Sequence, residues 1–230
     1  DRLIAPYIYY AALVRSRLAK NSSVLDWGAF LSHMTFLLQD SFNVTAYNPA
    51  TSAQIKYWEK QLKIKNKLVD DGFEKLNKTI PSDSYDAVIS SGVLEHTFEF
   101  GVEDTDALRA LHRVTKPGGY LFIWNLPTEH ALAEKVSMRR KNWRHVKRYT
   151  LDEILIKLNL TGFDVVDIAL DDLLYNKFSR LTKDPVKAWE WDQKLIRVPG
   201  LGRYAHHFTI VARKVEHFPK NPATSGYVTY

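Results

Sequence analysis

Short apolar segments alternate with helical segments through the first half of this chain, and that alternation constrains the fold more than any other feature. The run Tyr85–Ser91 is apolar almost throughout, which is typical of a central parallel strand covered on both faces. Strict alternation of strand and helix implies right-handed crossovers and a parallel sheet flanked by helices. The candidate strands in this part are 22–28, 43–47, 67–70, 85–91 and 119–125.

Two further candidate strands, 163–169 and 208–214, are separated by a long Trp-rich insertion at 170–207. Because no clean crossover helix joins them, they can pair differently from the first five. The predicted fold class is α/β, a Rossmann-like seven-stranded, mostly parallel sheet with flanking helices and an insertion between the last two strands. The predicted helices are 2–20, 32–39, 105–114, 150–160 and one that begins at Asn48-Pro49. The helix 105–114 ends before the helix-breaking segment Lys116-Pro117-Gly118-Gly119. The helix 150–160 begins with a capping box formed by Thr150 and Glu153.

Composition excludes several classes of protein. Hydrophobic residues make up 45% and charged residues 25%, so the chain can bury a core and is not disordered as a whole. The absence of cysteine removes disulfides, thiolate metal sites and a cysteine nucleophile. The formal charge of +6 is spread along the chain, so it tolerates an anionic partner without demanding one. No apolar run reaches the roughly 20 residues of a spanning helix, and we expect a soluble, cytoplasmic protein.

The predicted domain organisation has three parts. An N-terminal helix occupies 1–21, the main domain 22–215 includes the insertion, and a tail with scattered Pro and Gly occupies 216–230. Since the first residue is Asp1 and the tail resembles a linker, we expect one domain of a larger protein.

Ligands of open parallel sheets bind at the carboxyl ends of the strands, near the point where strand order reverses. This rule directs attention to the ends of the candidate strands, which are Asp26–Gly28, Asn48, 70–72, Ser90–His96 and Asn125.

Four segments resemble, in order, the motifs of class I S-adenosylmethionine-dependent methyltransferases, in particular the small-molecule, methyltransferase type 11-like branch. They are VLDWG at 24–28, DAVISSGVLEHT at 86–97, LHRVTKPGGYLFI at 111–123 and HVKRYTLDEILIKLNLTGF at 145–163. The resemblance covers roughly 22–214, and four motifs in the right order are much more specific than a lone Asp-x-Gly. It implies that S-adenosylmethionine is the cofactor and S-adenosylhomocysteine the product, with no metal.

The resemblance also implies roles for residues at the strand ends. Asp26 would hold the turn or the cofactor's amino group, and Gly28 would let the backbone approach the cofactor. Asn48 stands where the family usually has an acid that binds the ribose. The full set of implied cofactor-binding residues is Asp26, Gly28, Tyr47, Asn48, Asp71, Gly72 and Phe73 around the nucleoside, and Ser90 and Ser91 under the methionine part.

Two departures from the family pattern bear on cofactor affinity. Positions that usually carry further glycines read Phe30 and Ser32, and Phe supplies neither a positive φ nor room for a ligand cheaply. Asn48 in place of an acid removes a charge-assisted pair with the ribose. We therefore expect weaker cofactor binding than is usual in the family.

Methyl transfer from a sulfonium is an in-line displacement, so catalysis consists of positioning plus removal of the acceptor's proton. His145 is the preferred base, because it lies in a loop after the fifth strand, over the acceptor side. The other candidates are His96, Glu95 and Tyr149, with Asn125 as an orienting group. The structural alternatives are a cofactor-capping role for His96, a helix-opening charge for Glu95 and a plain turn for Asp71-Gly72.

The predicted function is O-methylation of a small polar acceptor, with a sugar or glycan hydroxyl as first choice. The N-terminal tyrosines Tyr7, Tyr9 and Tyr10 would cover the cofactor as a lid helix does in related proteins, although core packing explains at least one of them better. Trp189 and Trp191 cannot both face inward, so one is expected to line an acceptor pocket or contact a partner.

Two other functions stay open. One is a degenerate domain that binds cofactor poorly and serves in protein interaction. The other is RNA methylation, which is supported by a basic cluster that contains a Trp. We favour the alternative interpretation of this cluster as a solvent-exposed helix face. The cluster comprises Arg139, Arg140, Lys141, Trp143, Arg144, Lys147 and Arg148.

Overall fold

The computed structural model describes residues 4–30, 33–48, 56–57, 59–69, 79–132, 135, 145 and 147–215. Its centre is a seven-stranded sheet of order β3-β2-β1-β4-β5-β7-β6. The strands are β1 (Ser23–Trp27), β2 (Asn43–Asn48), β3 (Asn66–Val69), β4 (Tyr85–Ser91), β5 (Thr115–Pro127), β6 (Phe163–Asp171) and β7 (His207–Lys214). The helices are α1 (Ile4–Arg17), α2 (His33–Leu38), α5 (Asp104–Val114), α7 (Leu151–Leu160), α8 (Tyr175–Thr182) and α9 (Pro185–Ile196), with the 3-10 helices η1 (Leu94–Phe100) and η2 (Gly202–Tyr204).

The first five strands are parallel and the last two are not. β7 inserts between β5 and β6 and runs antiparallel to both. Strand order reverses between β1 and β4, which places the ligand-binding edge of the sheet at their carboxyl ends. The sequence-based prediction of a mostly parallel α/β sheet, with the last two strands paired differently, is therefore confirmed.

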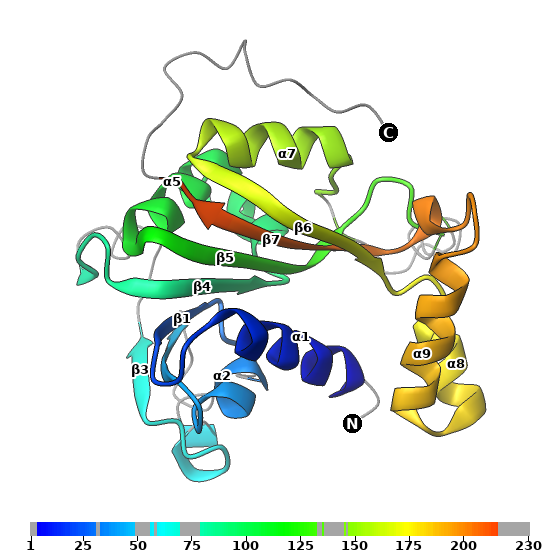
Figure 1. Ribbon diagram of the computed structural model, residues 1–230, viewed down its shortest axis with the longest axis horizontal. Coiled ribbons are helices and arrows are strands. Elements are labelled where there is room, and N and C mark those ends of the chain that lie inside the picture. The colour runs from blue at the N-terminus through cyan, green and yellow to red at the C-terminus, as the bar shows by residue number, and fades with distance from the viewer. Residues whose placement is uncertain are drawn as a thin grey trace.

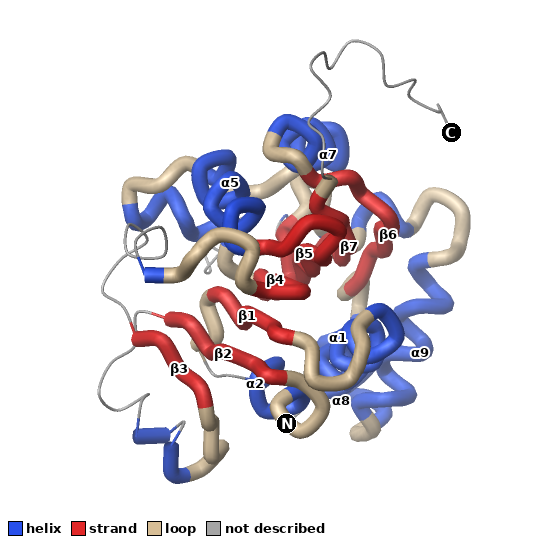
Figure 2. The backbone as a smooth tube through the Cα atoms, turned by 60° about the vertical axis from the view of Figure 1, so that its left-hand side comes forward, coloured by secondary structure: helices blue, strands red, loops and turns tan. Residues whose placement is uncertain are grey.

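Successive side chains of the central strands point to opposite faces of the sheet and contribute to two hydrophobic cores. In β4, Val88 faces one core and Ile89 the other. The first core lies under α5 and α7, and the second under α1 and α2. Figure 1 shows these two helix pairs on opposite faces of the sheet, and Figure 2 shows the same layers from another side. Since successive side chains of a strand point to opposite faces, a continuous apolar run is what a sheet covered on both faces needs.

β5 differs from its predicted bounds. It begins directly after α5 and includes Lys116-Pro117-Gly118-Gly119, which the sequence indicates only as a breaker. Gly118 has a positive φ of 70°, and the β4–β5 register shifts between Tyr85 and Ala87. The segment is therefore an irregular start of the strand. Gly119 also needs its small size, because an added Cβ would lie 2.8 Å from the carbonyl oxygen of Asp86.

The predicted capping box of α7 is present, since the Thr150 side chain accepts a hydrogen bond from the backbone N–H of Glu153 at 3.1 Å. The insertion between β6 and β7 forms α8 and α9, which stand beyond the carboxyl ends of the parallel strands (Figure 1). None of the described helices is long and apolar enough to cross a membrane.

The N-terminal helix is more than a lid. Tyr10 of α1 is buried and stacks on Trp124 of β5, with ring centroids 4.7 Å apart and planes within 6°. Its hydroxyl donates to Asp171 Oδ2 at 2.9 Å, which ties α1 to the end of β6. Of the two insertion tryptophans, Trp189 packs on Tyr9 and Tyr10, whereas Trp191 is 46% exposed. α1 is therefore an integral helix of the fold.

Candidate active site

The end of β1 is fixed by a buried carboxylate. Asp26 Oδ2 accepts hydrogen bonds from the backbone N–H of Thr35 at 3.0 Å and from its hydroxyl at 2.6 Å. Burial raises the pKa of Asp26 to about 6, and the hydrogen bonds from Thr35 act against that rise. The observed role of Asp26 is thus to hold the first turn of α2 against the strand end.

The turn after β1 needs glycine at position 28. The N–H groups of Gly28 and Ala29 both donate to the carbonyl oxygen of Tyr47, at 2.8 and 3.0 Å. Gly28 has a φ of 76°, and an added Cβ would lie 2.3 Å from Val93 Cγ2. Phe30 also has a positive φ, of 29°, and its side chain is 57% exposed. The loop therefore retains a backbone that favours glycine, and the Phe30 ring lies largely in solvent.

Polar groups converge where β2, β4 and β5 end. Asn48 is nearly buried at the end of β2, and Ser90 is buried at the end of β4. Asn125 Nδ2 donates to Ser91 Oγ at 3.0 Å, and the Tyr7 hydroxyl hydrogen-bonds with both of these side chains. Burial raises the pKa of Tyr7, so it keeps its proton at neutral pH. The predicted residues Asp71, Gly72, Phe73 and Ser32 lie outside the described residues.

These residues fit a sulfonium nucleoside. The Ser90 hydroxyl is buried and, among the described residues, has no hydrogen-bond partner. A polar group of a bound ligand would satisfy this hydroxyl. Next to it, Gly92 has a φ of 65° and an added Cβ would meet nothing closer than 3.7 Å. An unmatched hydroxyl and an open backbone at one strand end are what the methionine part of such a ligand requires.

Three of the four candidate catalytic residues lie together beyond β4. Glu95 and His96 belong to η1, and His145 belongs to the segment after β5; one ligand atom from each lies within 4.8 Å of the others. Glu95 and His145 are buried. The His96 and His145 rings are 5.9 Å apart, and His96 Nδ1 is 2.7 Å from Glu99 Oε1.

The Glu95 carboxyl of this cluster has a raised pKa. Burial raises its pKa to about 7, while the neighbouring His96 and His206 act to lower it. Its Oε2 atom is buried and, among the described residues, has no hydrogen-bond partner. A buried carboxyl that titrates near neutral pH beside an imidazole is suited to accept or stabilise a proton taken from an acceptor.

Tyr149 occupies a different position from the other three candidates. It is fully buried, and its hydroxyl donates to Asp104 Oδ2 at 3.1 Å. Asp104 also pairs with Lys147 and Lys157, each at 2.7 Å. This polar network joins α5, α7 and the segment after His145. Tyr149 thus takes part in a buried polar network, and its catalytic role stays a prediction.

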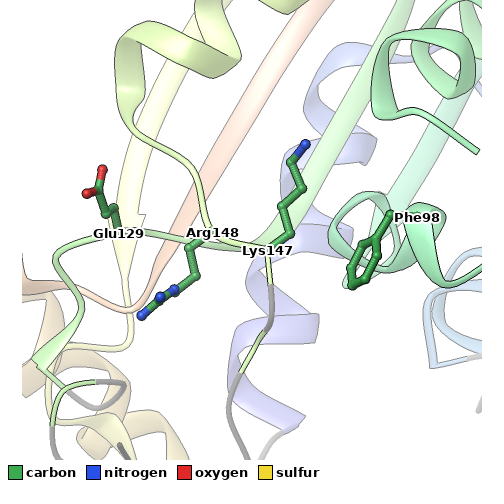
Figure 3. Close-up of a pocket in the computed structure, with 4 residues that line it drawn as sticks. All are labelled: Phe98, Glu129, Lys147 and Arg148. Carbon is green, nitrogen blue, oxygen red and sulfur yellow. The ribbon is translucent and has the colours of Figure 1, made fainter.

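A cavity of about 440 Å³ adjoins these elements and is lined by Phe98, Glu129, Lys147 and Arg148. Figure 3 shows Phe98 across from Lys147, with Arg148 directed toward the side of Glu129. Phe98 shares η1 with Glu95 and His96, and Lys147 is two positions after His145. The cavity thus combines one aromatic ring with charges of both signs.

Comparison with known proteins agrees with this geometry. Residues 25–123 match the family model described as a methyltransferase domain. This segment is therefore similar to the methyltransferase domains that use S-adenosylmethionine. No curated protein sequence matches this chain. The match includes the carboxyl ends of β1 and β4, and it stops within β5 at Ile123.

Solved structures of methyltransferases share the fold. A protein from Haloferax volcanii, solved in complex with a methyltransferase activator, has 17% identity and a TM-score of 0.63, over 92% of this chain and 90% of that one. A SAM-dependent methyltransferase from Archaeoglobus fulgidus has 18% identity and a TM-score of 0.61, over 90% and 94%. The 1,6-didemethyltoxoflavin-N1-methyltransferase of Burkholderia thailandensis, solved with 1,6-didemethyltoxoflavin and S-adenosylhomocysteine, has 16% identity and a TM-score of 0.59, over 92% and 79%.

Sequence reasoning missed two further histidines close to this cluster. The ring of His206 lies 5.6 Å from that of His145, and the ring of His207 lies 6.3 Å from it. His207 begins β7 and His206 directly precedes it, beside Asp171, which ends β6, and Asp172, which follows it. The signal available in the sequence was the pair of dipeptides, Asp-Asp after one strand and His-His before the next, which only an antiparallel β6–β7 pairing brings together.

Proposed function

We propose that this protein transfers a methyl group from S-adenosylmethionine to a hydroxyl of a small polar acceptor, with a sugar or glycan hydroxyl as first choice. The observation that carries this proposal is the burial of His145 beside Glu95, at the side of the sheet where the strands end. When bound, the cofactor supplies an electrophilic methyl group on a positively charged sulfur. The protein then has to place the acceptor and take its proton.

His145 is proposed as the base that takes this proton. The new bond forms between the acceptor oxygen and the methyl carbon as the bond between that carbon and sulfur breaks, and the hydroxyl proton moves to an imidazole nitrogen of His145. Glu95 is close enough to stabilise the imidazolium that results, as a carboxylate does beside other catalytic histidines. The Asn125 and Tyr7 side chains are proposed to hold Ser91 in place under the methionine part.

The cavity beside this cluster supports a sugar as acceptor. An exposed aromatic ring, Phe98, offers an apolar face, and Glu129 and Arg148 offer an acceptor and a donor of hydrogen bonds. Sugars combine apolar C–H faces with hydroxyl rims, so such a lining matches both parts. The cationic side chains also suit a phosphate of an activated or lipid-linked sugar.

The test is a methylation screen with labelled S-adenosylmethionine over sugars, sugar phosphates and nucleosides, followed by kinetics of variants. His145→Gln should lower kcat by about 10²- to 10⁴-fold and leave the cofactor Kd almost unchanged. His130→Gln, at an exposed histidine, is the matched control and should leave kcat unchanged. Intact turnover in His145→Gln would remove His145 as the base, and methylation of nucleosides alone would remove the sugar.

A further inference from the structure

Two histidines and two aspartates meet where β6 ends and β7 begins. Asp171 is paired with His207 in the antiparallel ladder, and the His206 N–H donates to the carbonyl oxygens of Asp171 and Asp172 at 3.1 Å. Asp172 has a positive φ of 56°, which turns the chain out of β6. The backbone thus fixes these residues on the rigid edge of a sheet, as a preformed binding site requires.

The side chains of Asp172, His206 and His207 converge. Each offers one ligand atom, and these atoms all lie within 4.8 Å of one another. Asp172 Oδ2 is 3.4 Å from His206 Nδ1 and 3.9 Å from His207 Nδ1, and the two rings stack with centroids 4.0 Å apart. Zinc bonds of roughly 2.0–2.2 Å to nitrogen and oxygen, in a tetrahedron, put ligand atoms roughly 3.3–3.5 Å apart. Asp172 and His206 already have this separation, and the His207 ring would have to turn out of its stack on His206 for one of its nitrogens to reach the same ion.

A second carboxylate supports the first. Asp171 Oδ1 lies 3.5 Å from His207 Nδ1, while its Oδ2 accepts hydrogen bonds from Tyr10 at 2.9 Å and Thr209 at 2.6 Å. Asp192 is a third carboxylate in this region. It accepts hydrogen bonds from the backbone N–H groups of Leu173 and Leu174. In the part of the chain that the structure describes, the ion pairs recorded for Asp171 and Asp172 are with His206 and His207. Three carboxylates against two histidines leave negative charge that a divalent cation would balance.

We propose that Asp172, His206 and His207 bind a divalent transition-metal ion of the zinc class. Two imidazoles and one carboxylate suit zinc and its first-row neighbours, whereas Mg²⁺ and Ca²⁺ prefer all-oxygen ligands. Asp171 is the supporting carboxylate, which Tyr10 and Thr209 hold in place. It lies beside His207 Nδ1, so His207 would bind the ion through Nε2. Three protein ligands leave a fourth position for water or a substrate oxygen. This site does not include the strand-end residues that are proposed to hold the methyl donor.

Calorimetric titration of the tag-free chain with zinc chloride tests this site. The wild-type chain should bind one equivalent with a Kd of about 1 μM or tighter. Asp172→Asn and His207→Gln should each weaken binding by more than about 100-fold, and Thr209→Val, which frees the supporting carboxylate, by about 10- to 100-fold. His130→Gln, at an exposed histidine, should leave the Kd unchanged.

Two further measurements keep the test decisive. Titration of the same samples with S-adenosylhomocysteine reports whether each variant is folded and tests the cofactor site independently. Imidazole NMR signals of the wild-type chain should shift at His206 and His207 when zinc is added, which needs no variant. The proposal is overturned if the wild-type chain shows no saturable binding, if both ligand variants bind as tightly as it does, or if those two ring signals do not move. Any of these results would leave the histidines simply as ion-pair partners of the aspartates.

Discussion

The rings of His145 and His206 lie 5.6 Å apart, although one residue follows β5 and the other precedes β7. The proposed acceptor side of the site is therefore assembled from segments that are distant in the chain, with η1 as a third contributor. The donor side is built differently, from the ends of neighbouring parallel strands. This difference makes the two sides separable by mutation.

Gly28→Ala should be more damaging than an ordinary glycine substitution. Its φ of 76° disfavours any side chain, and its Cβ would also lie 2.3 Å from Val93 Cγ2. We expect a loss of about 2–4 kcal/mol in the free energy of unfolding, measured by denaturant titration.

Gly101→Ala is the matched control for this substitution. Gly101 has a φ of 71° but nothing within 4 Å of an added Cβ, so it isolates the backbone effect, about 1 kcal/mol. The double variant Gly28→Ala/Val93→Ala should recover part of the difference. Equal losses at 28 and 101 would show that the contact with Val93 carries no cost.

Phe30→Gly should tighten cofactor binding. Phe30 has a φ of 29°, which glycine adopts without strain, so the substitution should relax the loop that follows β1. We expect the free loop of the variant to adopt the bound conformation more readily, and about 1 kcal/mol of that preference corresponds to roughly a fivefold lower Kd for S-adenosylhomocysteine, measured by calorimetry. Phe30→Ala removes the ring but keeps the Cβ, and should not give this gain. A weaker affinity in Phe30→Gly would contradict the interpretation of Phe30 as a departure that costs affinity.

Glu95 makes stability depend on pH. Because burial raises its pKa from 4.5 to about 7, the folded state keeps the proton over that interval while the unfolded state releases it. The free energy of unfolding contributed by this group therefore falls as pH rises from about 4.5 to about 7. The Glu95→Gln variant has no proton to lose at this position. Its free energy of unfolding, relative to that of wild type, should therefore rise by about 2 kcal/mol between pH about 5 and about 8.

Denaturant titrations across this pH range measure the effect. Glu190→Gln on α9, at an exposed carboxylate, should track wild type at every pH. A constant difference between Glu95→Gln and wild type would mean that Glu95 does not titrate in this interval.

Tyr7→Phe should weaken cofactor binding without unfolding the protein. The Tyr7 hydroxyl bonds to Ser91 and Asn125, the side chains at the ends of β4 and β5. Loss of these bonds should raise the Kd for S-adenosylhomocysteine by about 3- to 10-fold. Tyr9→Phe, two positions along the same helix at a 44% exposed ring, should not change it. Equal values for the two variants would limit α1 to a packing role.

The sequence predicts the central sheet well because the strands there are buried on both faces. In the structure, strand β4 begins at Tyr85 and ends at Ser91, as the sequence predicts. The start of β5 was missed because a Pro-Gly-Gly segment normally ends structure, whereas here a register shift accommodates it within the strand.

The candidate site was only partly predictable. Glu95, His96 and His145 could be grouped, because strand ends meet at one edge of a parallel sheet. The position of Tyr149 was not predictable, because sequence position does not reveal that its hydroxyl reaches Asp104 of α5. His206 and Asp172 were missed because their contact depends on the antiparallel pairing of the last two strands.

The most direct test of the central claim, that the strand ends form a working methyl-donor site, is calorimetric titration of the wild-type chain with S-adenosylhomocysteine. We predict one site per chain with a Kd of about 1–100 μM. The absence of binding heat up to about millimolar ligand would contradict this account and would instead favour a degenerate domain that serves in protein interaction.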